Sequence, residues 1–348
     1  MNLSEVSQDT QSIATETVGK CPICDSEGQY IYHQLSDFLF GKSTGWDLKQ
    51  CTNRSCKLIW LDPRPTPDEI WKAYVDYYTH RKQKSSFLYN QTIAKGYLAL
   101  SYGYKEGTSF LQRLLGLLAY VNPILKAEVD FKVLYVKKLD QGKLLDFGCG
   151  NGWLLENLRD LGWQVQGFDF DQKAIDYCKT NNLDVSLVNW PGIPAGSLDV
   201  ITINHVIEHV HDFDDLIENC KQKLKPGGQL VIATPNTDNW LFKKYQSNWM
   251  QLDPPRHLHL FNTQNLQDVL KKHGFQIKKS KSSFRIDAWT TIVSRNVKRE
   301  GYFNYMGEKK KKVDVFFGLL NQLITSFYLL FDKKIAGELI VIAEKPAK

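Results

Sequence analysis

The sequence predicts an α/β fold built on a doubly wound parallel sheet. Strand-like and helix-like segments alternate from Leu144 to Asn236 at the spacing of strand–helix–strand units. The first strand is followed by three glycines at every second position, and a helical pattern begins at Trp153. At 348 residues, with 43% hydrophobic and 24% charged residues, the chain can hold one large domain and a smaller one.

Each element of this sheet has a local signal. Short apolar runs mark the strands, and Gly162 and Gly274 end two of the helices. We expect strands over residues 144–147, 163–169, 185–188, 198–203 and 229–236, and helices over residues 153–161, 171–182, 214–225 and 263–274. Ligands bind outside the carboxyl ends of the strands of such a sheet, so the loops there should form the site.

Charge and termini favour a cytoplasmic protein. No apolar segment follows a basic start, so the chain shows no export signal. The net charge is +6, and the isoelectric point is near 8.7. This mild excess suits an anionic substrate or surface, or is simply a solvated basic face.

Four of the seven cysteines gather near the N-terminus, namely Cys21, Cys24, Cys51 and Cys56. Two thiolate pairs can close a tetrahedron around Zn²⁺ and stabilise a module with little core of its own. The second pair has four intervening residues instead of the usual two, and reduced buried thiols are the alternative. Because four cysteines leave no open position, the zinc should be structural.

The glycine segment has the form of a ligand loop. Glycines allow a ligand to approach the main chain, and the helix beyond offers unpaired N–H groups. A dinucleotide site would require glycine where this chain has Trp153, so NAD is disfavoured.

The motif Asp146-x-Gly148-x-Gly150-x-Gly152 resembles the first motif of class I S-adenosylmethionine (SAM)-dependent methyltransferases. The segments 208–210 (Glu-His-Val) and 225–228 (Lys-Pro-Gly-Gly) resemble ubiquinone-type and sugar-type members. The resemblance covers residues 140–280, implies a Rossmann-like sheet, and makes residues 338–344 its last, antiparallel strand.

In these enzymes the acid at the position of Asp146 faces the methionyl ammonium. Asp169, about 20 residues beyond the loop, is placed to bind both ribose hydroxyls. Phe170 could pack on the adenine or be an ordinary core aromatic, and Asn189 replaces the acid that often contacts the adenine. Cys149 has no identifiable base partner and only fills the loop. The expected cofactor-binding set is Asp146, Gly148, Cys149, Gly150, Gly152, Asp169, Phe170, Asn189 and Asn204.

The expected domains follow from these motifs. The cysteine-rich segment resembles the zinc module ahead of the methyltransferase domain in bacterial sugar methyltransferases, where a Pro-x-Pro segment leads to a tyrosine pair, here Tyr77-Tyr78. We expect a disordered tail over 1–19, a zinc-binding module over 20–62, a helical linker or cap over 63–140, the SAM-binding domain over 141–280, a helical insertion over 281–337, and the last strand and tail over 338–348.

Histidines on two loops are the candidate bases. His209 is the first candidate and His257 the second, while Glu208 is a weaker one. Beside His257, Arg256 would contact an anionic group. The alternatives are that His209 only orients its loop and that the proline-led segment of His257 only forms the pocket wall.

The resemblance implies methylation of a sugar or glycan in cell-surface polysaccharide or deoxysugar biosynthesis, with a hydroxyl as the expected acceptor group. A quinone or lipid O-methyltransferase is one alternative, and a non-catalytic SAM-fold scaffold is another. An RNA base methyltransferase is disfavoured, because residues 204–207 lack the Asn/Asp-Pro-Pro-aromatic motif of amino-group methylation.

Residues 309–334 combine lysines with an apolar seam. Lys309 to Lys312 precede Phe316, Leu320, Leu323, Phe327 and Leu330, which share one face of a helix. Such a helix could lie on an anionic membrane near a lipid-linked glycan. The alternative is that it packs with the apolar helix near 111–118 as a lid or dimer surface.

Overall fold

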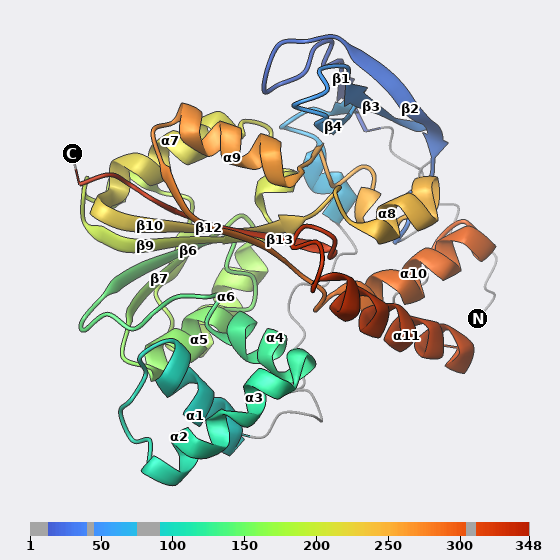
Figure 1. The fold of residues 1–348 in the computed structure, drawn as a ribbon. Coiled ribbons are helices and arrows are strands. Elements are labelled where there is room, and N and C mark those ends of the chain that lie inside the picture. Colours follow the sequence, from blue (N-terminus) through green and yellow to red (C-terminus); the bar gives the residue numbers. More distant parts are fainter. Residues whose placement is uncertain (1–12, 40–44, 75–90, 304–310, 348) are drawn as a thin grey trace, which may run out of the picture.

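The structure is a computed structural model that describes residues 13–39, 45–74, 91–303 and 311–347. Seven strands form the main sheet in the order β12-β13-β10-β9-β6-β7-β8 (Figure 1). They are β6 (Lys143–Phe147), β7 (Gln164–Asp169), β8 (Val185–Leu187), β9 (Leu198–Asn204), β10 (Leu224–Pro235), β12 (Gln276–Ser283) and β13 (Glu338–Glu344). Only β13 runs antiparallel to its neighbours. The predicted doubly wound sheet with its antiparallel last strand is confirmed.

Successive side chains of the central strands enter two different cores. Leu144 and Val200 belong to one core, and Leu145 and Ile201 to the other, as the period of two along a strand requires. Helices α5 and α6 cover the first core, and α7 and α9 the second (Figure 1). Their bounds are α5 Trp153–Asp160, α6 Gln172–Thr180, α7 Phe213–Lys223 and α9 Thr263–Lys272. The result is a three-layer sandwich.

A second sheet holds the cysteine-rich segment. Its order is β11-β4-β3-β2, with β2 Gly28–Leu35, β3 Trp46–Cys51, β4 Ile59–Leu61 and β11 His259–Leu260. The edge strand β11 comes from the loop after β10 and pairs with β4, and Leu61 N donates to Leu258 O at 3.0 Å. The module expected over residues 20–62 is therefore completed by the methyltransferase region.

Regular secondary structure begins closer to the N-terminus than we expected. Strand β1 (Thr15–Glu16) pairs with β5 (Arg64–Pro65), and Arg64 Nε donates to Glu16 Oε1 at 2.8 Å. The disordered tail expected over residues 1–19 is thus wrong for this part, and residues 1–12 lie outside the description. His211 Nε2 also lies 2.8 Å from Pro65 O, which fixes the proline-rich segment to the loop after β9.

In the described part of the chain, four helices follow the cysteine-rich sheet in the sequence and pack beside α5, and the cap expected over residues 63–140 stays a prediction. They are α1 Gln91–Ser101, α2 Phe110–Gly116, α3 Leu118–Val121 and α4 Pro123–Lys132. They share a core with α5, and Trp163 Nε1 donates to Tyr104 Oη at 3.0 Å near the start of β7. This contact places the segment after α1 at the amino edge of the sheet, whereas Phe131 of α4 stacks on Trp153, the residue after the glycine loop, at 4.9 Å. Tyr77 and Tyr78 lie outside the described residues.

The expected insertion lies between β12 and β13. It contains α10 (Asp287–Glu300) and α11 (Lys312–Tyr328), which pack on each other (Figure 1). A short helix α8 (Trp240–Tyr245) follows β10 and lies beside α10.

Candidate active site

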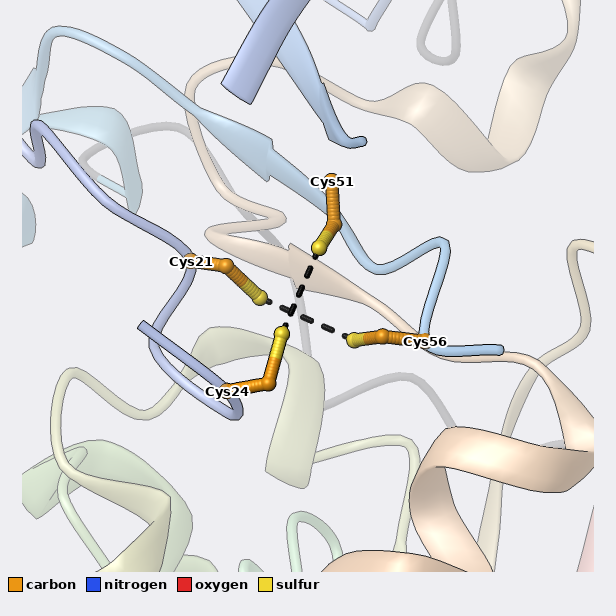
Figure 2. Close-up of side chains that lie close together, drawn as sticks. All are labelled: Cys21, Cys24, Cys51 and Cys56. Carbon is orange, nitrogen blue, oxygen red and sulfur yellow. Dashed lines mark hydrogen bonds between the residues drawn. The ribbon is translucent and has the colours of Figure 1, made fainter. Parts of the chain in front are cut away.

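The four N-terminal cysteines converge on one centre (Figure 2). Their sulfur atoms all lie within 4.8 Å of one another, with Cys21 Sγ 3.7 Å from Cys56 Sγ and Cys24 Sγ 3.4 Å from Cys51 Sγ. Four sulfurs around Zn²⁺ at about 2.3 Å would be separated by about 3.8 Å. The cluster therefore fits a tetrahedral zinc with no open position.

The cluster is attached to the main domain by its outer contacts. Asn262 Nδ2 and Asn265 Nδ2 at the start of α9 donate to Cys56 O at 2.7 Å and 3.0 Å. A metal here would thus join the segment of Cys21 and Cys24 to that of Cys51 and Cys56, and the asparagines would tie the site to α9. This is the role of a structural zinc.

We expect one zinc per chain in protein purified without chelator. Cys51→Ser should lose the metal and unfold more readily, because three ligands hold zinc less well and the module has little core of its own. Cys220→Ala, which removes a buried thiol far along the chain, should keep it. Elemental analysis that found no stoichiometric metal would refute the site.

The glycine loop has the backbone that its sequence predicts. Gly148, Gly150 and Gly152 have φ of +76°, +55° and +73°, in the left-handed region that favours glycine. A Cβ on Gly148 would lie 2.3 Å from Val206 Cγ2, so the loop after β9 packs directly on this one. A Cβ on Gly150 would meet nothing within 4 Å, which leaves room for a ligand against the main chain.

Asp169 lies at the end of β7 beside this opening. Its Oδ2 accepts from Gly150 N at 2.7 Å, and its Oδ1 accepts from Asp171 N at 2.9 Å. Each carboxylate oxygen can accept a second hydrogen bond, so both remain available to ribose hydroxyls. The carboxylate also fixes the loop that would hold the rest of the cofactor.

Two aromatic side chains lie near the same opening. Phe170 is 64% exposed, so the alternative of a core aromatic is wrong, and its ring meets Phe147 edge-on at 5.7 Å. Trp190 stacks on Phe147 at 5.5 Å, a contact that sequence reasoning missed although Trp190 follows Asn189 directly. Asn189 uses its side chain to accept from Gly192 N at 3.3 Å and so begins the turn η2 (Trp190–Gly192).

Two polar side chains at the ends of β6 and β9 are suited to an ammonium group. Burial raises the pKa of Asp146 to about 7, opposed by the Thr202 hydroxyl that donates to it at 2.6 Å. Asn204 Oδ1 is buried and accepts no hydrogen bond from any residue that the structure describes. A cation bound between them would ionise the carboxyl and satisfy the amide.

Cys149 lies inside the loop as filler. It is buried, and its pKa is raised by its contact with the Cys178 thiol and by burial, so it stays a thiol. Such a thiol is a poor nucleophile.

The Asp169→Ala variant should bind SAM at least tenfold more weakly. It would lose hydrogen bonds to the ribose, each worth about 1.5–3 kcal/mol when the acceptor is charged, and the anchor of Gly150. Asp171→Ala, two residues further on, is the control. Calorimetry that gave equal SAM affinities for wild type and Asp169→Ala would refute this assignment.

Glu208, His209 and His257 form the second cluster. One ligand atom from each lies within 4.8 Å of the others, a spacing that a divalent cation could also bridge. The two imidazole rings meet at 4.6 Å. His209 lies in the turn η3 (Ile207–His209), and His257 comes from the loop before β11, so the structure unites both predicted histidines.

The main chain fixes both imidazoles. His209 Nδ1 lies 2.9 Å from Arg256 O, and His257 Nδ1 lies 2.7 Å from Gln251 O. Since a carbonyl only accepts, each Nδ1 carries a proton, and a neutral His209 therefore keeps its lone pair on Nε2. Burial lowers the pKa of His209 to about 4, helped by His257 and opposed by Glu208, so this ring is neutral at pH 7. Tyr74 Oη is also 3.0 Å from His209 Nδ1.

A histidine that sequence reasoning did not single out links two buried acids. His205 Nε2 lies 2.9 Å from Glu338 Oε1, and its Nδ1 lies 3.3 Å from Glu208 Oε1. Burial lowers the pKa of His205, but the two carboxylates raise it more, to about 9. Burial raises the pKa of Glu208, but the hydrogen bond and the positive charge of His205 lower it by more, to about 2. Glu208 is therefore a charged acceptor at the base of the cluster.

Arg256 does not face a substrate. Its guanidinium is fully buried and pairs with Asp37 at 2.7 Å and with Asp253 at 2.6 Å. The expected contact with an anionic group of the acceptor is thus wrong. Arg256 joins the cysteine-rich module, which carries Asp37, to the loop that positions both histidines.

The seven-stranded sheet with its glycine loop defines a class I SAM-dependent methyltransferase domain. Residues 118–280 match the sequence model of the family described as methyltransferase domain, and this part of the chain belongs to that family.

Several relatives share part of this region. The ubiquinone biosynthesis O-methyltransferase of Cupriavidus pinatubonensis is 34% identical over 103 residues, 27% of this chain and 41% of that protein. That of Burkholderia multivorans is 29% identical over 150 residues, 40% of this chain and 63% of that protein. A probable SAM-dependent methyltransferase of Mycolicibacterium smegmatis is 27% identical over 140 residues, which are 39% of this chain and 52% of that protein. The chain spans about half the length of the curated relatives it matches.

Solved structures resemble the chain at low identity. A SAM-dependent methyltransferase from Mesorhizobium loti has a TM-score of 0.44 and 17% identity, covering 63% of this chain and 97% of that one. Phosphoethanolamine N-methyltransferase 2 of Haemonchus contortus, in complex with SAM, has a TM-score of 0.44 and 16% identity. The match covers 83% of this chain and 63% of that one.

Proposed function

We propose that this protein transfers the methyl group of SAM to a hydroxyl group, with His209 as the base. The observation that carries this proposal is the neutral, oriented His209 on a loop that packs on the glycine loop. SAM would bind through Asp169 and Asn204 with its sulfonium methyl toward the histidine cluster.

The reaction is an in-line displacement in which alignment matters most. The acceptor oxygen forms a bond to the methyl carbon as the carbon–sulfur bond breaks, and S-adenosylhomocysteine leaves. The hydroxyl proton passes to Nε2 of His209. The Glu208 carboxylate would stabilise the imidazolium that forms, since it stays charged and lies beside the ring.

For the acceptor we propose a ring hydroxyl on a lipid-attached quinone precursor. The supporting fact is the similarity to O-methyltransferases of ubiquinone biosynthesis. A sugar or glycan hydroxyl in polysaccharide assembly is the second candidate. The cysteine cluster with its tetrahedral spacing favours it, because a zinc module precedes the catalytic domain in the sugar methyltransferases that the sequence resembles.

A transfer assay with SAM labelled in its methyl group separates these acceptors. The panel would contain a catechol with a polyprenyl tail, the same catechol without the tail, nucleotide sugars, lipid-linked glycans and RNA. We expect label in the tailed catechol, in an alkali-stable ether. Label in a sugar would select the second candidate, and label in RNA would refute hydroxyl transfer to either.

A further inference from the structure

Helix α11 packs with its polarity reversed. Its polar residues Asp314, Asn321, Gln322 and Thr325 are buried. The predicted apolar seam faces solvent instead, with exposed fractions of 61% for Phe316, 38% for Leu320, 54% for Leu323, 57% for Phe327 and 75% for Leu330. An amphipathic helix of a soluble domain normally buries its apolar face.

Specific contacts hold the polar face inward. Asp314 Oδ1 accepts from Arg295 Nε at 2.7 Å, and Thr325 Oγ1 accepts from Trp240 Nε1 at 2.7 Å. Asn321 Nδ2 donates to Thr291 Oγ1 at 3.1 Å. These partners come from α8 and α10. If α11 rotated to bury its apolar face, the buried polar groups on α8 and α10 would lose their hydrogen bonds, which is costly. Within the described chain α11 packs on α10 and residues such as Leu111 and Leu114 stay exposed, so the lid expected with residues 111–118 does not form, whereas the dimer surface stays a prediction.

A second exposed apolar patch lies on α2 and α3. The small residues Gly116 and Ala119 face inward. The exposed members are Phe110 at 82%, Leu111 at 62%, Leu114 at 53%, Leu117 at 50%, Leu118 at 49%, Tyr120 at 50% and Val121 at 78%. We call these residues, together with the exposed face of α11 and Leu330–Phe331, the apolar surface.

Residues that neighbour the two patches in the sequence pack on one small apolar cluster. Ile124 in the first turn of α4 and Leu329 after α11 both pack against the small cluster of Ala127, Phe284 and Ala336. Val121 and Leu330, which flank this contact in the sequence, are 78% and 75% exposed. The ends of the two patches therefore lie near each other, and each patch gathers exposed apolar side chains that on ordinary protein exteriors are scattered singly.

Charges indicate what covers this surface. From 311 to 334 the exposed charged residues are Lys311, Lys312, Lys333, Lys334 and Asp332. The remaining acid, Asp314, is buried between Arg295 and Arg299. Lysines at both ends of an outward apolar helix match anionic lipid headgroups around an acyl interior. None of the described helices has the length and apolar character needed to cross a bilayer, so contact would be at the interface.

We propose that the apolar surface docks this protein on an anionic membrane. The segment after α11 lies at the edge of the sheet that carries the active site, because Ser282 Oγ donates to Lys333 O at 2.8 Å and Glu338 pairs with Pro235. A docked enzyme would thus hold the carboxyl edge of its main sheet near the membrane. Docking does not depend on the proposed reaction, whereas its use in delivering a lipid-attached acceptor rests on it.

Co-sedimentation with vesicles tests this proposal without turnover. The full chain should pellet with vesicles of phosphatidylglycerol and phosphatidylcholine at low salt, and be released as ionic strength rises. It should remain soluble with pure phosphatidylcholine. Leu323→Ser/Phe327→Ser should reduce the bound fraction at least about fivefold, and Lys333→Gln/Lys334→Gln should weaken mainly the salt-dependent part.

The control is Leu139→Ser/Leu187→Ser, which removes two exposed apolar side chains of 46% and 54% exposure elsewhere on the protein. It should bind vesicles like wild type, and all variants should keep SAM affinity. No binding of wild type at low salt, or equal binding of the α11 variant and the control, would overturn the proposal. So would a stable dimer that the α11 variant abolishes, because a second copy would then occupy the surface.

Discussion

The His209→Ala variant should turn over about 10²- to 10⁴-fold more slowly than wild type, with SAM affinity unchanged. The residue would take the hydroxyl proton, and alanine leaves that proton without an acceptor. Because the pKa of His209 is about 4, the ring stays neutral well below pH 7. The His209-dependent rate should therefore hold down to about pH 5, where an ordinary histidine would already be protonated.

His257→Ala is the matched control, since His257 is also held by a carbonyl but is not the first candidate base. It should lose less activity than His209→Ala. Equal rates for wild type and His209→Ala would transfer the role to His257 or show that no base is needed. Two metals per chain by elemental analysis would make the histidines ligands, because Glu208, His209 and His257 have the spacing for it.

Arg256→Met should destabilise the protein by about 3–5 kcal/mol in urea unfolding, because it removes the buried guanidinium that pairs with both Asp37 and Asp253. Arg159→Met, which removes an exposed arginine paired with Asp160, should change the free energy of unfolding by less than about 0.5 kcal/mol.

Removing all three charges should recover part of the lost stability. The triple variant Arg256→Met/Asp37→Asn/Asp253→Asn no longer buries an unpaired charge. An unchanged unfolding midpoint for Arg256→Met would contradict the view that this residue joins the cysteine-rich module to the histidine loop.

Local signals explain why the sheet and the cofactor loop could be predicted. The alternation of strands and helices defines a doubly wound sheet, and the spacing of Gly148, Gly150 and Gly152 requires a backbone that only glycine adopts easily. Asp169 was found because its position at the end of the second strand follows from the same topology. These inferences use residues close together in the chain.

Contacts between distant segments could not be predicted. The pairing of β11 with β4 joins residues about 200 positions apart, and a two-residue strand has no periodicity of its own. The sequence suggests that Arg256 contacts an anionic group of the acceptor, because nothing near Arg256 in the sequence indicates that its partner is Asp37.

The reversed helix α11 illustrates a different limit. Periodicity showed that Phe316, Leu323 and Phe327 share one face. It could not show which face packs inward, since that depends on the partners offered by α10 and α8. Only the structure shows that Asp314 and Thr325 are the buried side.

A crystal structure of the full chain with S-adenosylhomocysteine tests the central claim most directly. We predict one bound nucleoside, with its ribose hydroxyls on Asp169, its ammonium group donating to Asn204 Oδ1, and its sulfur facing His209. A nucleoside bound away from the loop of residues 146–152, or a sulfur directed away from the Glu208–His209–His257 cluster, would contradict the account.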